Sequence, residues 1–173
     1  MKKLRKGVFE TNSSSMHSVV ISGNSDDFDD FPALKKDGMV HIQCDEFGWY
    51  YDGHYYGVEK KLSYLATLIA TQACQHYGYE RYEEENLPAE LNRENMEWNE
   101  DFVLVDNILM EYCKCGGWAI NRMDGRYYPW GYIDHQSYYP SIREFLEHEC
   151  NGIPVENFLF SSGVELEIDN DNH

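Results

Sequence analysis

Residues 58–77 have the sequence VEKKLSYLATLIATQACQHY. Apolar side chains recur in this stretch at intervals of three and four residues, which places them on one face of an α-helix: Leu62, Leu65, Ala66, Ile69, Ala70, Ala73 and Cys74. Gly78 follows at the position where a helix is expected to end. A membrane span needs about 20 predominantly apolar residues, and Lys60, Lys61 and Ser63 interrupt this run. The stretch therefore predicts a helix of a water-exposed domain over 58–77.

Strand patterns lie on both sides of that helix. Val19-Val20-Ile21-Ser22 is rich in β-branched residues, residues 40–44 alternate between apolar and polar, and residues 164–168 alternate strictly. Phe158-Leu159-Phe160 leads into this last predicted strand.

The region between these strands predicts further helices and a hairpin. Residues 80–101 hold nine acids and two arginines, which indicates a solvated helical hairpin or loop and helix interrupted at Pro88. Residues 102–115 return to a helical period that ends at Gly116-Gly117. Residues 118–122 and 126–130 flank Asp124-Gly125, a typical β-hairpin turn. Ser141 is expected to cap a short helix through His148, with Glu144 completing a capping box.

Together these patterns predict one α+β domain over residues 1–173, with a small, mostly antiparallel sheet and three to four helices. Residues 1–7 form a basic N-terminal tip and residues 169–173 a polar tail. The length suits a single core.

The strongest compositional signal is negative charge. Fourteen Lys and Arg residues stand against 31 Asp and Glu residues, a net charge of −17. Four of the basic residues lie within the first six positions, so residues 7–173 carry −21. Such a surface repels phosphate backbones, which argues against direct nucleic-acid binding. It suits a basic protein partner, whose nucleic-acid groove an acidic domain can occupy by offering carboxylates in place of phosphates. The alternative is that the acidity serves solubility alone.

Two acidic segments are the predicted partner-binding regions. Fourteen Tyr residues and four Trp residues add side chains that are common at interfaces, although they also fill half-buried sheet surface. The predicted partner-binding residues are Asp26, Asp27, Asp29, Asp30, Glu83, Glu84, Glu85, Glu90, Glu94 and Glu97.

The five cysteines favour a reducing compartment. Their number is odd, their spacing fits no disulfide framework, and no signal peptide precedes them, so a cytoplasmic location is expected. Cys113, Cys115, His148 and Cys150 are residue types that bind Zn²⁺, but their spacing is closer than in most structural zinc sites. Buried free thiols are the alternative, and no cofactor is expected.

Two further constellations could carry catalysis. Ser13, Ser14, Ser15 and Ser18 surround His17, and a hydroxyl beside a base is the basis of nucleophilic catalysis. Consecutive residues of a strand face opposite sides, however, so His17 and Ser18 would diverge if the strand begins there. These serines are instead expected to hydrogen-bond the backbone of a loop.

Glu165 and Glu167 share one face of the last predicted strand. With an upstream serine and arginine, such a pair resembles the Arg, Ser and Glu-x-Glu set of ADP-ribosyltransferases. The serines lie far upstream of the usual spacing, and Arg5 is the basic candidate ahead of them. A solvent-facing or edge strand explains the same alternation. An enzyme of this kind is therefore the alternative function.

Residues 9–18, FETNSSSMHS, and the segments FLF at 158–160 and IDNDN at 168–172 resemble a group of phage and prophage proteins of Gram-positive bacteria. The resemblance implies a phage product acting in the cytoplasm of a bacterial host, and it carries no catalytic residues with it. In that context the acidity predicts an inhibitor of a host nucleic-acid-binding protein, most specifically an anti-CRISPR protein that binds a CRISPR effector nuclease. A zinc-stabilised phage structural factor is a third possibility.

Overall fold

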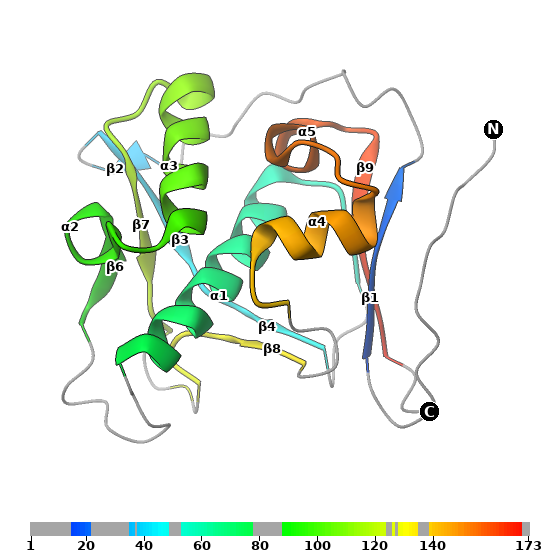
Figure 1. Ribbon diagram of the computed structural model, residues 1–173, viewed down its shortest axis with the longest axis horizontal. Helices are drawn as coiled ribbons and strands as arrows, with labels where there is room; N and C mark the ends of the chain where they lie inside the picture. The colour runs from blue at the N-terminus through cyan, green and yellow to red at the C-terminus, as the bar shows by residue number, and fades with distance from the viewer. Residues whose placement is uncertain are drawn as a thin grey trace. The chain divides into compact units, whose positions relative to one another are not determined.

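The computed structural model describes residues 15–21, 35–36, 38–48, 53–77, 88–123, 126, 128–134 and 139–170 (Figure 1). Its strands are β1 Ser15–Ile21, β2 Lys35–Lys36, β3 Met39–Gln43, β4 Glu46–Phe47, β5 Gly53–Tyr55, β6 Glu90–Asn92, β7 Trp118–Asn121, β8 Tyr132–Ile133 and β9 Val164–Asn170. Its helices are α1 Val58–Tyr77, α2 Arg93–Met96, α3 Glu100–Cys113, α4 Ile142–Cys150 and α5 Val155–Phe160. The α+β class predicted from the sequence is confirmed.

The chain divides into two compact units. The terminal unit comprises Met1–Phe31, Phe47–Leu62 and Ile133–His173, and the central unit comprises Pro32–Glu46 and Ser63–Tyr132. The expectation of one domain over residues 1–173 stays a prediction.

The terminal unit is built on a three-stranded antiparallel sheet in the order β1-β9-β5. Strand β9 is central and pairs with both neighbours, so that Ser18 on β1 and His54 on β5 are both register partners of Glu167. Helix α4 lies beside β1 and helix α5 beside β9 (Figure 1). Val164, Leu166 and Ile168 are buried on one face of β9.

The central unit is built on a four-stranded sheet in the order β2-β3-β7-β6. Strands β3 and β7 are parallel, whereas β2 and β6 pair antiparallel with their neighbours. Trp118, Ala119 and Ile120 of β7 are all buried, so both faces of this strand are covered. Helix α3 packs on one of them through Phe102, whose ring stacks on Trp118 with centroids 5.1 Å apart.

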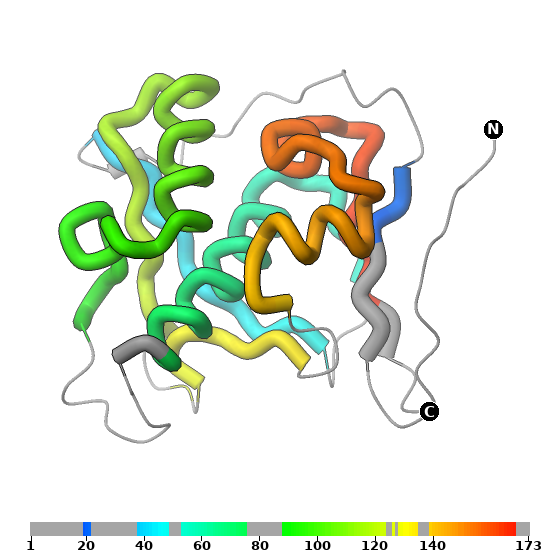
Figure 2. Tube along the Cα trace, in the orientation of Figure 1, coloured from blue at the N-terminus to red at the C-terminus, as the bar shows by residue number. Residues whose placement is uncertain are grey.

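Helix α1 is one unbroken helix with the bounds predicted from the sequence (Figure 2). Its middle is buried all around rather than on one face, since every residue from Lys61 to Ala70 is buried. The polar groups there need partners. Ser63 Oγ donates to the Gln43 carbonyl at 2.8 Å, and Thr67 Oγ1 donates to the Ser63 carbonyl at 2.9 Å.

The most demanding of these groups is Lys61, which is fully buried at the start of α1. Its ammonium donates to the carbonyl oxygens of Ser161 at 3.0 Å and Val164 at 3.2 Å. The Nζ atom also lies 5.9 Å from the centre of the Phe158 ring. Lys61 thereby joins α1 to the end of α5 and the start of β9.

Side-chain caps define the starts of two helices. Asn99 accepts from the Phe102 amide at 2.8 Å at the start of α3, and Ser141 accepts from the Glu144 amide at 3.1 Å at the start of α4. The predicted Ser141 cap is thus confirmed. Helices α3 and α4 are followed by the C-cap residues Lys114 and Asn151, which both adopt the left-handed conformation.

Four predictions about individual elements differ from the structure. Residues 118–122 and 126–130 do not pair as a hairpin, because β7 is an interior strand whose partners are β3 and β6. In the acidic region from 80 to 101, residues 80–87 lie outside the described residues, and the described part contains helix α2 as well as the strand β6, which the charge pattern did not indicate. Phe158–Phe160 belongs to helix α5 rather than to the last strand. The strand β1 also extends back to Ser15, so Ser15 and Ser18 lie in a strand and not in a loop.

Candidate functional site

Three of the ten predicted partner-binding residues lie among the described residues. Glu90 is on β6, Glu94 is on α2 and Glu97 follows α2, all in the central unit. The others, Asp26, Asp27, Asp29, Asp30, Glu83, Glu84 and Glu85, lie outside the described residues. The candidate surface is therefore built around α2.

The segment around α2 is held by hydrogen bonds within the segment and by a hydrogen bond to helix α1. Asn92 and Asn95 form a capping box. The Asn95 side chain accepts from the backbone amide of Asn92 at 2.7 Å, and the Asn92 side chain accepts from the backbone amide of Asn95. The Trp98 indole donates to the Asn95 carbonyl at 3.1 Å, and Asn99 donates to Gln72 of α1 at 2.9 Å. These bonds fix the path of the chain from β6 through α2 into α3.

The exposed residues of this segment and of α3 combine acidic and large apolar side chains. We define the α2–α3 face by these residues: Glu94, Glu97, Trp98, Glu100, Leu104, Asn107, Met110, Glu111 and Tyr112. Trp98, Leu104, Met110 and Tyr112 are four of the five large hydrophobic residues that are exposed in the described part of the chain. An exposed apolar group rimmed by charge is typical of a protein-binding surface.

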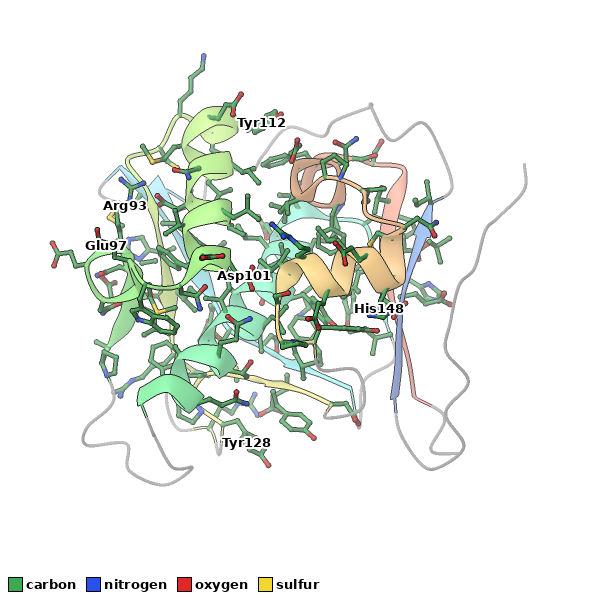
Figure 3. All side chains as sticks on the ribbon, in the orientation of Figure 1. Arg93, Glu97, Asp101, Tyr112, Tyr128 and His148 are labelled. Carbon is green, nitrogen blue, oxygen red and sulfur yellow. The ribbon has the colours of Figure 1, made fainter. Side chains whose placement is uncertain are left out.

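The α3 part of the face follows the helical repeat. Glu100, Leu104, Asn107 and Glu111 are spaced by four, three and four residues and are all exposed. Figure 3 labels Glu97, which follows α2, and Tyr112, which lies in the last turn of α3.

The one arginine of this region does not offset the exposed acids. Arg93 Nη2 donates to Asp106 Oδ2 and also lies 3.2 Å from the Met110 sulfur. The Asp106 side chain is 1% exposed and that of Arg93 is 53% exposed. Because the positive charge of Arg93 is neutralised by the buried Asp106, the exposed carboxylates at positions 94, 97, 100 and 111 dominate the local charge.

A second cluster lies in the terminal unit, on the sheet formed by β1, β9 and β5. His54 Nδ1 is 2.6 Å from Glu165 Oε1. The Glu165 side chain is 2% exposed and that of His54 is 63% exposed. A carboxylate can only accept, so Nδ1 is the donor in this contact, and in the neutral imidazole Nε2 then carries the lone pair.

Tyr56 is the second partner of the same carboxylate. Its hydrogen bond to Glu165 raises the pKa of the phenol, because the phenolic proton is held by a negatively charged acceptor. Tyr56 is itself exposed. Glu165 therefore orients one exposed imidazole and one exposed phenol from a buried position.

The environment of Glu165 and Glu167 corrects one expectation from the sequence. The strand that carries them is neither an edge strand nor a solvent-facing one, because β9 is the middle strand and Glu165 is buried. The histidine that contacts Glu165 is His54, which the sequence did not indicate. His17 and Ser18 are consecutive residues of β1, which gives them no common face. Ser13, Ser14 and Arg5 lie outside the described residues.

The structure does not support a zinc site in the part of the chain that it describes. No group of three or more His, Cys, Asp and Glu side chains among those residues could hold a metal ion. Cys113 and Cys115 belong to the central unit, and His148 and Cys150 to the terminal unit. Cys115 donates to the Leu109 carbonyl at 3.3 Å, and burial raises the pKa of Cys150, as expected of buried thiols.

Neither His54 nor the apolar part of the α2–α3 face was singled out from the sequence. His54 lies in an aromatic, glycine-flanked stretch, GHYYG at 53–57, that gives no indication of a partner 111 residues away. Apolar residues such as Leu104 and Met110 are as common in buried helices as in exposed ones, so their residue types do not indicate exposure. Glu100 and Glu111, at the same helical spacing as Leu104, are the available signal that this side of α3 faces solvent.

Comparison of the chain with protein-family models, with curated proteins and with solved structures gives no match. Within the described residues, no helix has the length and apolar character needed to cross a bilayer. The resemblance to phage proteins stays a prediction.

Proposed function

We propose that this protein binds a basic nucleic-acid-binding protein through the α2–α3 face and inhibits it by occupying its nucleic-acid groove. The observation that carries the proposal is that the segment from α2 to the end of α3 holds exposed carboxylates together with four of the five large apolar side chains that are exposed among the described residues. The net charge of −17 supports it, because a field of this sign attracts a basic partner over a long range.

The two kinds of side chain serve different steps. Carboxylates at positions 94, 97, 100 and 111 take the places of phosphates and direct the encounter. Trp98 and Leu104 provide contact area, and tryptophan is among the residues that most often dominate binding energy. The hydrogen bond from the Trp98 indole to Asn95 restrains the ring before binding, which lowers the entropy lost in the complex.

The resemblance of residues 9–18 and of the C-terminal segments to phage proteins gives the proposal its context. In a phage product the partner would be a protein of the bacterial host, and a CRISPR effector nuclease is the most specific candidate. Such a nuclease has a positively charged channel for its heteroduplex.

The test is a titration of the full chain against purified CRISPR effector nucleases and other basic nucleic-acid-binding proteins. We expect complex formation at low salt that weakens as salt rises, and release of bound nucleic acid from the partner. Absence of binding at low salt, or binding that is independent of salt, contradicts the electrostatic mechanism.

Two double variants separate the α2–α3 face from general acidity. The pair Glu97→Gln and Glu100→Gln removes two charges from the face, and the pair Glu144→Gln and Glu147→Gln removes two exposed charges at the same spacing from α4. Each pair has one member in the first turn of a helix, so their effects on helix stability are matched. We expect the first pair to weaken binding several-fold more than the second. Equal effects would show that net charge, and not this face, drives binding.

Trp98→Ala tests the apolar contribution. We expect it to weaken binding by about tenfold or more at all salt concentrations, because contact area is lost without a change in charge. An unchanged affinity would remove Trp98 from the interface.

A further inference from the structure

The cluster around Glu165 has the parts of an acid–base site. An exposed imidazole is held by a buried carboxylate at 2.6 Å, so its tautomer and orientation are set before any substrate arrives. In hydrolytic sites a base acts best when a third group orients it in this way. Tyr56, the other partner of Glu165, presents an exposed ring and hydroxyl in the same cluster.

We propose that His54 is a general base and Glu165 its positioning residue, in a site that hydrolyses uncharged or cationic esters. His54 Nε2 takes a proton from a water molecule while the water oxygen bonds to the acyl carbon. The bond between that carbon and the leaving oxygen then breaks. The proton on His54 passes to the leaving oxygen, which restores the neutral imidazole. The products are a carboxylic acid and an alcohol, and no electrons are exchanged with another reactant.

The preference for uncharged or cationic substrates follows from the carboxylates of β9. Glu165 of β9 contacts His54, and Glu167, also on β9, is the register partner of His54 across the β5–β9 pair. Negative charge at this distance repels phosphate and carboxylate groups and adds to the field of an acidic chain. The Tyr56 ring offers a surface on which an aromatic leaving group can stack.

This activity does not rest on the proposed function. The His54 cluster belongs to the terminal unit, whereas the α2–α3 face belongs to the central unit. Loss of ester hydrolysis and loss of partner binding can therefore be observed separately in the same preparations.

The experiment measures turnover of 4-nitrophenyl acetate by the full chain, with 4-nitrophenyl phosphate as the anionic counterpart. The variants are His54→Gln, His54→Ala and Glu165→Gln. His148→Gln is the control because His148 is a second exposed histidine that lies outside this cluster. General-base catalysis contributes roughly 10²- to 10⁴-fold, so we expect His54→Gln to lower kcat by at least about 10²-fold. We expect His148→Gln to retain the wild-type rate and the phosphate ester not to be hydrolysed.

Two readouts distinguish catalysis from a structural role. Free imidazole should restore turnover to His54→Ala, and the wild-type reaction should be slower in D₂O because a proton moves in the rate-limiting step. For Glu165→Gln we expect kcat to fall by about tenfold or more with little change in KM, because the amide holds the ring but does not stabilise its positive charge. Its melting temperature checks that the variant is folded, and Tyr56→Phe tests the cluster with less risk to the fold.

The proposal is overturned if His54→Gln and wild type hydrolyse the ester equally, or if His148→Gln loses as much activity as His54→Gln. It is also overturned if the phosphate ester is hydrolysed in preference to the acetate. Failure of imidazole to restore activity to a folded His54→Ala variant contradicts the role of His54 as base.

Discussion

Replacement of Lys61 by methionine tests whether its buried ammonium stabilises the terminal unit. Methionine keeps most of the apolar stem of lysine but cannot donate to the carbonyl oxygens of Ser161 and Val164. Hydrogen bonds to a charged donor contribute about 1.5–3 kcal/mol each, so the two bonds together contribute roughly 3–6 kcal/mol.

Part of this loss is recovered, because methionine avoids the cost of taking an ammonium group out of water. The Ser161 carbonyl also keeps a second donor, the Val164 amide at 3.3 Å, so it stays hydrogen-bonded in the variant. We therefore expect Lys61→Met to lower the free energy of unfolding by about 2–3 kcal/mol. For a chain of this length that corresponds to a fall in Tm of roughly 4–12 °C. Lys61→Ala should lower the free energy of unfolding by about 2 kcal/mol more than Lys61→Met does, because it also leaves a cavity.

The assay is denaturant unfolding followed by circular dichroism, with Tm measured in parallel. Lys60→Met is the control, because Lys60 is the adjacent residue and is half-buried over the rings of Phe47 and Tyr55. We expect that variant to lose at most about 1 kcal/mol. A Lys61→Met protein as stable as wild type would refute the reasoning, since it would mean that desolvation of the ammonium cancels its hydrogen bonds.

Three further predictions concern other buried groups. Burial raises the pKa of Cys74 to about 12 and also raises the pKa values of Cys44 and Cys150. Above about pH 8.5 the unfolded state releases protons from these thiols while the native state keeps them, so Tm should fall as pH rises further. A Tm that is constant from pH 8 to 10.5 would contradict this. Gly131→Ala should lower the free energy of unfolding, measured with denaturant, by at least about 2 kcal/mol more than Gly38→Ala does. Both glycines have positive φ, but only at Gly131 would a Cβ clash with the Asp45 carbonyl. Equal losses would show that φ alone matters. Arg93→Ala should lower the free energy of unfolding by about 2–3 kcal/mol, because it leaves the buried Asp106 carboxylate without its cation. The double variant Arg93→Met with Asp106→Leu should recover most of that loss. A double variant no more stable than Arg93→Ala would contradict the explanation.

The elements predicted well from the sequence are those whose signal is local. Helix α1 was predicted with both bounds because its apolar period spans twenty residues, and the Ser141 cap needs only its own first turn. The predicted pairing of residues 118–122 with 126–130 is wrong because the partners of β7 are β3 and β6, whereas the turn signal is local; Asp124 and Gly125 themselves lie outside the described residues. Strand pairing over such distances leaves no periodic trace in one sequence.

The candidate sites were predicted in part for the same reason. The acidity of the sequence led to the prediction of Glu94 and Glu97, which belong to the α2–α3 face, and of Glu90, which does not, but the exposure of Leu104 depends on which side of α3 packs on Trp118. The alternation of residues 164–168 draws attention to Glu165 and Glu167. The proposed role of Glu165 depends on its contact with His54, which forms because β5 and β9 are neighbours in the sheet. Burial of Glu165 follows from the central place of β9, which alternation alone does not indicate.

The pairing of β9 with both β1 and β5 has a consequence for synthesis on the ribosome. All residues of the central unit emerge before β9, and they include its entire four-stranded sheet. In the terminal unit, β1 and β5 have no hydrogen-bonded strand between them until Val164–Asn170 has emerged. The nascent chain therefore carries unpaired strand edges for most of its translation, which is the condition in which chaperones bind or chains associate. Folding of the terminal unit, and with it the His54 cluster, can be completed only after the last strand has left the ribosome.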